Sequence, residues 1–182
     1  VRHWLGAGGR DEVYAHLGPR GGTEAALADD GNSGDDAAGD GTYGLEGIVP
    51  APGTDHGWKD ITITAVASGG MTADAVARIE INGPPSVDDV FANPAIVPPD
   101  GTTSYSVSAR VTDVNGAGDV AEVKVDLSDA GGPADAAMYD DGAHGDGAAG
   151  DGIYGAEGFS VPVGTDRGDY TISVSAVDLS GE

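Results

Sequence analysis

The chain of 182 residues carries 31 acidic side chains against 8 Lys and Arg, which gives a formal net charge of -23. This excess of negative charge repels nucleic-acid backbones and anionic membrane surfaces, so we expect neither as a partner. Cysteine is absent, which excludes disulfides and thiol chemistry, and no apolar run approaches the roughly 20 residues of a membrane-spanning helix.

An acidic, glycine-rich loop is the first distinctive element, at residues 29–44 with the sequence DDGNSGDDAAGDGTYG. Carboxylates this close together repel one another unless the loop stays open to water or folds around a cation. The intervening glycines let the backbone turn tightly enough for the second arrangement. The loop therefore indicates both an architecture and a ligand.

Alternating apolar residues predict half-buried strands further along the chain, and no stretch shows a helical stripe. Turn signals such as Asn115-Gly116 and Pro99-Asp100-Gly101 separate these strands. Short strands punctuated by turns are typical of an antiparallel β-sandwich, so we predict an all-β fold. The strands with the clearest alternation are 75–81, 105–111, 123–127 and 170–177.

A second acidic loop at residues 140–155, with the sequence DDGAHGDGAAGDGIYG, repeats the first. A shift of 110 to 111 positions extends this match over most of the chain, and such a period is the length of a small domain. Gly83-Pro84-Pro85 is the natural junction, because proline donates no backbone hydrogen bond and restricts the residue before it. We therefore predict two tandem domains, residues 1–83 and 84–182.

Each repeat lacks a segment that the other has. The first has no counterpart of residues 84–110, and the second has none of the strand 75–81. We expect both outer ends of the chain to cut through a domain, with N-terminal strands missing from the first repeat and the last strand missing from the second. The chain is then a portion of a longer tandem array, or neighbouring copies supply the missing strands and form a filament by strand complementation.

The sequence resembles tandem immunoglobulin-like β-sandwich repeats of large secreted or surface proteins of bacteria and archaea. The resemblance implies an extracellular or cell-surface location and a role as spacer, stalk or adhesive module, with adjacent domains or copies of itself as partners. Lys59 stands where the second repeat has Tyr170, an aromatic residue suited to anchor a strand corner. The segments that carry the resemblance are 94–101, 111–113, 119–127, 138–154 and 168–178.

The acidic loops predict calcium, which prefers six to eight oxygen ligands on flexible segments. Three aspartates in each loop are five residues apart, and a fourth precedes them. The alternative is that Asp-Gly pairs form exposed turns whose carboxylates accept local backbone hydrogen bonds. The candidate ligands are Asp29, Asp30, Asp35 and Asp40 in the first loop and Asp140, Asp141, Asp146 and Asp151 in the second.

Other residues of the loops are expected to have different roles. Tyr43 and Tyr154 close the two loops and are predicted to anchor them to the core. Asp36 and His144 lie outside the shared set, since Gly147 and Ser33 occupy the matching positions. Zinc is not expected without cysteine or a repeated histidine.

Catalysis is not expected, because no histidine is matched in the other repeat and the serines lie in no nucleophile elbow. The clustered aspartates also lack the separated, differently tuned carboxylate pair of a glycosidase. Trp4 and Trp58 leave a glycan-binding site as an alternative, although neither is repeated. The sequence thus predicts a non-catalytic, calcium-stabilised structural module of an extracellular protein or filament, with adhesion or carbohydrate binding as the alternative.

Overall fold

The computed structural model describes residues 12–18 and 24–182, and the chain divides into two compact units, Val1–Ile81 and Asn82–Glu182. The division falls two residues before the predicted junction. His3 and Trp4 lie outside the described residues. Within the described part, no helix is long and apolar enough to cross a membrane.

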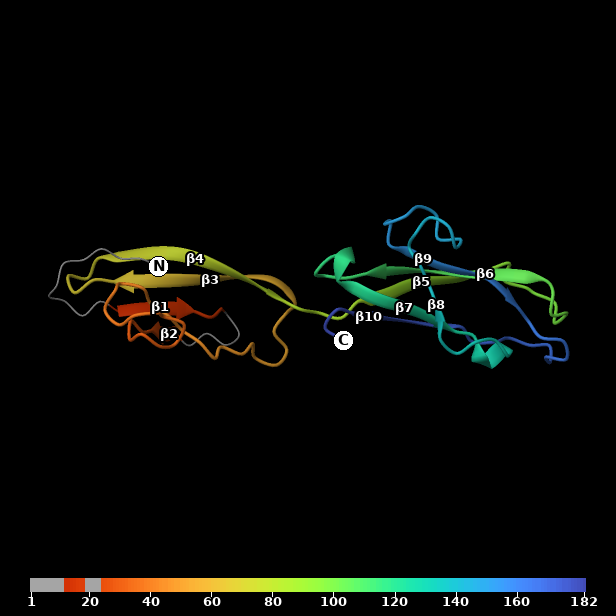
Figure 1. Cartoon of the computed structure of the whole chain (residues 1–182), viewed down its shortest axis with the longest axis horizontal. Coiled ribbons are helices and arrows are strands. Elements are labelled where there is room, and N and C mark those ends of the chain that lie inside the picture. The colour runs from red at the N-terminus through yellow and green to blue at the C-terminus, as the bar shows by residue number, and fades with distance from the viewer. Residues whose placement is uncertain (1–11, 19–23) are drawn as a thin grey trace. The chain divides into compact units, whose positions relative to one another are not determined.

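The first unit contains an antiparallel sheet of four strands in the order β2-β1-β3-β4 (Figure 1). Val13 and Ala15 of β1 and Ala65 of β3 are buried, because alternate residues of a strand point to the same face. The strands are β1 (Glu12–His16), β2 (Glu24–Leu27), β3 (Gly57–Val66) and β4 (Thr72–Ile81).

The second unit has two antiparallel sheets, in the orders β10-β7-β8 and β5-β6-β9, which form its two layers (Figure 1). Short 3-10 turns, η1 (Ala117–Asp119) and η2 (Ser128–Ala130), flank β7. The strands are β5 (Ser86–Asn93), β6 (Ser104–Thr112), β7 (Val120–Asp126), β8 (Ala136–Ala137), β9 (Ile153–Ser160) and β10 (Ser173–Asp178).

The core of the second unit lies between these layers. Every second residue of β6 faces inward, as the alternation predicts, and the partner sheet contributes apolar side chains from β7. Leu127, Val107 and Val125 are completely buried. The nine buried members of this core are Tyr105, Val107, Ala109, Val111, Val123, Val125, Leu127, Met138 and Ala156.

Equivalent strands of the two units pair in the same register. Val13 of β1 lies opposite Ala65 of β3. Val123 of β7, which matches Val13 in the sequence alignment of the repeats, lies opposite Ala176 of β10, which matches Ala65. Aligned residues of the two halves therefore also occupy equivalent places in their sheets.

An isolated bridge closes each acidic loop. Ala28 and Gly44 exchange backbone hydrogen bonds of 2.9 and 2.8 Å, and Tyr139 and Gly155 exchange bonds of the same lengths. Tyr139 follows β8, whereas Gly155 belongs to β9. The second bridge consequently joins the two layers of its unit along one side.

The predicted all-β class with antiparallel sheets is confirmed, and the described residues contain no α-helix. Several strand boundaries differ, most of all that of β10, which begins at Ser173 instead of Tyr170. Just before it, the backbone N–H of Thr171 donates a hydrogen bond of 2.8 Å to Asp129 Oδ2. A side chain of the η2 turn thus bonds the amide that a neighbouring strand would otherwise bond.

Candidate metal site

The first acidic loop is organised by Asp29, at its entrance. Asp29 Oδ1 accepts hydrogen bonds from the backbone N–H groups of Gly39, at 2.5 Å, and Asp40, at 3.2 Å. Asp29 Oδ2 accepts a third bond, of 3.0 Å, from Gly41 N–H. This carboxylate therefore fixes the far end of the loop against its start.

The second loop repeats these contacts with Asp140. Asp140 Oδ1 accepts hydrogen bonds from the backbone N–H groups of Gly150, at 2.6 Å, and Asp151, at 3.2 Å. Asp140 Oδ2 accepts one of 3.0 Å from Gly152 N–H. Because the donors occupy matched positions, the two sequences fold into the same closed loop.

A glycine at the exit of each loop permits a close backbone approach. A Cβ atom on Gly44 would lie 2.3 Å from the carbonyl oxygen of Ser33, and one on Gly155 would lie 2.4 Å from that of His144. Real Cβ atoms do not approach backbone oxygens so closely. Each closing bridge therefore requires glycine, because any side chain there would overlap the backbone of the loop.

A buried carboxylate lies at the centre of each loop, since Asp35 is 5% exposed and Asp146 is 3% exposed. Asp146 Oδ2 accepts hydrogen bonds from the backbone N–H groups of Asp141, at 2.5 Å, and Gly142, at 2.7 Å. Asp146 Oδ1 is buried and has no hydrogen-bond partner. A buried oxygen without a partner is uncommon in proteins and fits a bound ion or water.

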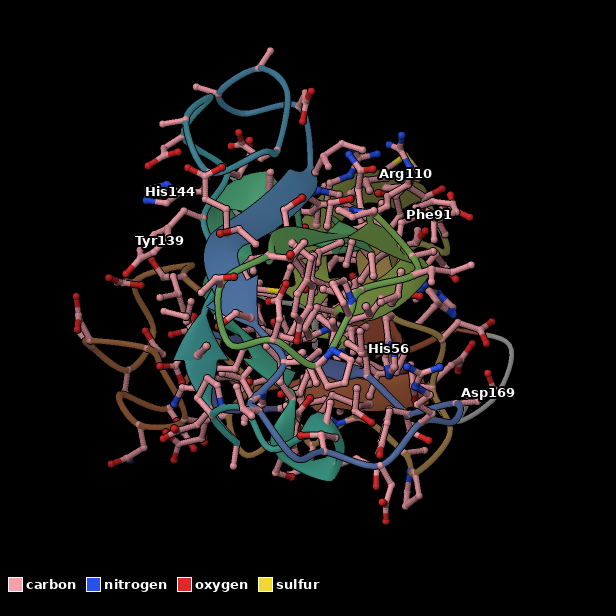
Figure 2. All side chains as sticks on the ribbon, turned by 90° about the vertical axis from the view of Figure 1, so that its right-hand side faces the viewer. His56, Phe91, Arg110, Tyr139, His144 and Asp169 are labelled. Atoms are coloured by element: carbon pink, nitrogen blue, oxygen red, sulfur yellow. The ribbon has the colours of Figure 1, made fainter. Side chains whose placement is uncertain are left out.

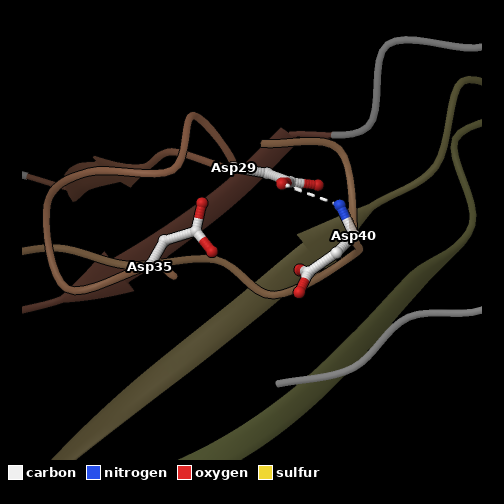
Figure 3. Close-up of side chains that lie close together, drawn as sticks. All are labelled: Asp29, Asp35 and Asp40. Atoms are coloured by element: carbon white, nitrogen blue, oxygen red, sulfur yellow. Dashed lines mark hydrogen bonds between the residues drawn. The ribbon is translucent and has the colours of Figure 1, made fainter. Parts of the chain in front are cut away.

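The structure groups the predicted ligands differently from their spacing of five residues. Asp29, Asp35 and Asp40 each offer an oxygen within 4.8 Å of the others, and Figure 3 shows the three side chains close together. Asp30 instead accepts a hydrogen bond of 2.9 Å from Asn32 N–H. The carboxylate that precedes the spaced set thus joins Asp35 and Asp40.

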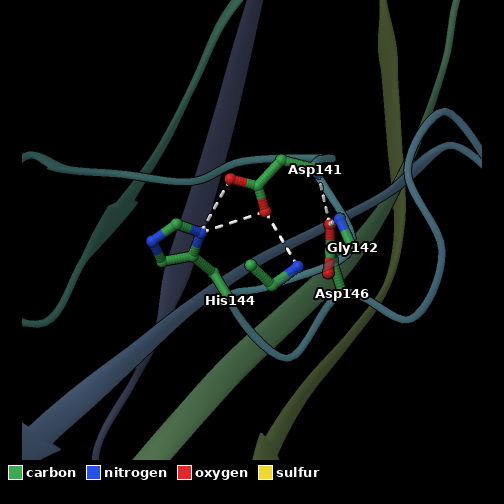
Figure 4. A network of polar contacts seen from close by, with 5 residues as sticks. Asp141, Gly142, His144 and Asp146 are labelled. Carbon is green, nitrogen blue, oxygen red and sulfur yellow. Dashed lines mark hydrogen bonds and ion pairs between the residues drawn. The ribbon is translucent and has the colours of Figure 1, made fainter.

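The second loop differs because His144 engages one of its aspartates. His144 Nδ1 lies 3.0 Å from both carboxylate oxygens of Asp141 (Figure 4). This contact raises the pKa of His144 and lowers the pKa of Asp141. The imidazole also lies against Tyr139, with ring centroids 4.8 Å apart, and both side chains are labelled in Figure 2.

In the second loop, Asp151 Oδ1 accepts a hydrogen bond of 2.9 Å from Ile153 N–H. Within the described residues, Asp140, Asp146 and Asp151 do not form a group with oxygens as close as those of the first loop. The site geometry is therefore tighter in the first loop, while the unpartnered oxygen belongs to the second.

Residues around the loops have distinct places. Tyr154 packs against the core of the second unit, and burial raises its pKa, in keeping with an anchoring role. Asp36 is exposed. Glu157 reaches the second loop, because a Cβ on Gly145 would lie 4.0 Å from its Oε2 atom.

A further carboxylate group escaped the sequence analysis. Asp113, Asp119 and Asp178 also offer oxygens within 4.8 Å of one another. They lie next to strand ends, after β6, before β7 and at the end of β10. Only the sandwich brings these distant positions together, so no local motif marks them.

These features define the class of the protein: an all-β chain of antiparallel sheets with a two-layer sandwich in its second unit. Residues 95–178 match the family model of the second Ig-like domain of conditioned medium factor, so the sandwich is immunoglobulin-like. The match runs from β6 to β10 and includes the second acidic loop. Comparisons with curated proteins and with solved structures give no match.

Proposed function

We propose that the chain is a non-catalytic, calcium-stabilised structural or spacer module of an extracellular surface protein or filament. The observation that carries the proposal is the buried carboxylate at the centre of each loop, above all Asp146 with its unpartnered Oδ1 atom. An ionised carboxylate is costly to bury unless a cation or hydrogen bonds compensate its charge.

The geometry of the first loop supports a bound cation. Asp29, Asp35 and Asp40 supply oxygens close enough to surround one ion. Calcium binds oxygens at about 2.3–2.6 Å, so two ligands on opposite sides of the ion are roughly 5 Å apart. Backbone carbonyls and water would complete the coordination. In the second loop the matching residues are Asp140, Asp146 and Asp151, with Asp141 held by His144.

Calcium would act on stability rather than on chemistry. An ion bound only by the folded state stabilises it by RT ln(1 + [L]/Kd), which is about 2.7 kcal/mol at a free calcium concentration 100 times Kd. The ion also offsets repulsion among the aspartates. An immunoglobulin-like sandwich with stiffened loops suits a spacer between adjacent domains or between copies of the chain.

Thermal melting with calcium and with a chelator tests the proposal. The parent is expected to melt at a higher temperature in calcium. A variant carrying Asp35→Asn and Asp146→Asn should show a smaller calcium-dependent rise, whereas Asp36→Asn, at an exposed neighbouring position, should keep the full rise. Equal melting of the parent in calcium and chelator would reject the calcium role. A variant that loses stability equally in both would assign the aspartates to hydrogen bonding alone.

Carbohydrate binding is the second candidate, and exposed Trp58 favours it. Its side chain is 60% exposed on β3, as a sugar-stacking residue must be. However, the guanidinium carbon of Arg78 lies 5.9 Å from the ring centroid and covers part of the indole. Titration of a glycan panel against tryptophan fluorescence, in the parent and in Trp58→Ala, tests this candidate: a saturable change that Trp58→Ala abolishes would support it.

A further inference from the structure

We propose that the second unit holds a divalent cation at a site separate from the acidic loops, formed by Asp113, Asp119 and Asp178. One oxygen of each carboxylate lies within 4.8 Å of the others. Two oxygens on opposite sides of a calcium ion are separated by about twice 2.4 Å. The spacing therefore matches ligands of a single ion.

The hydrogen bonding of Asp113 points to a ligand. Asp113 Oδ1 accepts a hydrogen bond of 2.6 Å from Asn115 N–H. Asp113 Oδ2 is buried from solvent and has no hydrogen-bond partner. The same carboxylate lies next to those of Asp119 and Asp178. Buried oxygens of proteins are normally paired, and a cation would pair this one.

Asp178 is buried, at 2% exposure, and the groups that donate hydrogen bonds to its carboxylate are neutral. Asp178 Oδ1 accepts hydrogen bonds from Ser180 and Glu182, and Oδ2 accepts one of 2.7 Å from Asn82 Nδ2. Oδ2 keeps a second lone pair, which a metal ion can use.

Hydrogen bonds from backbone N–H groups hold the segments around the three carboxylates in place. Leu179 N–H donates a bond of 2.9 Å to the carbonyl oxygen of Asp119, which ties the segment after β10 to the start of β7. Gly83 N–H donates one of 3.0 Å to Asn115 Oδ1. A cation here would therefore link the segment between β6 and β7 to the end of β10. Hydrogen bonds from Asn82 and Gly83 join the first residues of the unit to the same place.

The site is particular to the second unit. In the alignment of the repeats, Asp113, Asp119 and Asp178 match His3, Gly9 and Ala67, which together retain no carboxylate. The loop aspartates, by contrast, are present in both repeats. Oxygen ligands alone favour a hard cation, and three carboxylates from separate segments favour calcium over magnesium, which demands a stricter octahedron.

Residue-resolved NMR of the full chain during a calcium titration tests this site. The backbone amides of Asn115 and Ser180 report on the cluster, that of Gly142 reports on the second acidic loop, and that of Ser128 reports on the isolated carboxylate of Asp126. We expect saturable shifts at Asn115 and Ser180. We also expect Asp113→Asn to raise their calcium midpoint by about tenfold or more, because one charged ligand is lost. Asp126→Asn is the matched control and should change neither midpoint.

Shifts at Asn115 and Ser180 that are no earlier than those at Ser128 would overturn the site, as would an unchanged midpoint in Asp113→Asn. The Gly142 amide shows that the variant remains folded, and Asp119→Asn provides a second variant if Asp113→Asn does not fold. A magnesium titration measures the selectivity, and a lower midpoint for magnesium than for calcium would overturn the assignment to calcium. Because Gly142 and Ser180 are read separately, failure of the loop proposal and failure of this site give different spectra.

Discussion

Lys59 and Tyr170 occupy matched positions in the two units, and each donates a side-chain hydrogen bond to a backbone carbonyl shortly before it in the chain. Lys59 Nζ donates a hydrogen bond of 2.9 Å to the carbonyl oxygen of His56, and the hydroxyl of Tyr170 donates one of 2.6 Å to that of Asp166. Each side chain bonds back to the turn that leads into its strand. In the first unit, the ammonium group of Lys59 thus makes the hydrogen bond that the tyrosine hydroxyl makes in the second.

Removing the Tyr170 hydroxyl is expected to weaken the second unit. Tyr170→Phe keeps the ring and loses the hydrogen bond to Asp166, which should cost about 0.5–1.5 kcal/mol in urea-induced unfolding. Tyr139→Phe is the control, because it removes a hydroxyl group from a tyrosine that is 48% exposed. Equal stability of parent and Tyr170→Phe would show that the bond contributes nothing net.

Gly155→Ala should destabilise the second unit by about 1–3 kcal/mol, because the new Cβ would overlap backbone atoms of the loop. The nearest would be the carbonyl oxygen of His144, at 2.4 Å, and the amide nitrogen of Asp146, at 2.8 Å. Gly168→Ala, which has open space around its Cβ, should be tolerated. Chemical denaturation of both variants checks the difference, and equal midpoints would contradict the requirement for glycine.

Leu127→Ala is expected to cost about 2–5 kcal/mol, since a completely buried side chain leaves a cavity between the two layers. The matched change Leu179→Ala removes the same atoms from a side chain that is 72% exposed, and it should change stability by less than about 0.5 kcal/mol. Thermal or urea unfolding measures both. A similar loss in the two variants would contradict the position assigned to the core.

Asp100 should make part of the stability dependent on pH. The N–H and hydroxyl of Thr103 and the N–H of Thr102 donate to this carboxylate at 2.7–2.8 Å, and they hold its pKa well below the ordinary value of 3.8. A lowered folded-state pKa gives stability that is present above the unfolded-state pKa and lost as the pH falls toward the folded-state pKa.

The test compares the parent with Asp100→Asn at several pH values. The parent should be the more stable protein at neutral pH, and its advantage should shrink progressively below about pH 4, as the carboxylate is protonated. Urea unfolding at each pH measures the difference. An advantage that stays constant down to pH 2 would show that the charge of Asp100 has no part in it.

The strands were largely predictable, because burial on one face leaves a period of two in the sequence. Residues 105–111 fall within β6, whose inward residues are the apolar ones. Residues 170–172 have the same alternation but lie outside β10. Alternation shows that a segment suits a sheet, whereas pairing depends on a neighbour that the local sequence does not contain.

The acidic loops were recognisable from their composition, but the grouping of their ligands was not. Spacing favoured Asp30, whereas the chain reverses at Gly31, with φ 74°, and the side chain of Asp30 turns to Asn32. Asp29 takes the place beside Asp35 and Asp40. The cluster of Asp113, Asp119 and Asp178 required the fold itself, because antiparallel pairing sets the end of β10 against the start of β7.

The bridge between Tyr139 and Gly155 determines how the second unit can open. On that side, backbone hydrogen bonds join the segment after β8 in one layer to β9 in the other. The other side, where β5 lies beside β10, has no such tie among the described strand pairs. Water and denaturant are therefore expected to enter the core from the β5–β10 side. The second acidic loop, next to the Tyr139–Gly155 bridge, is expected to stay closed longest.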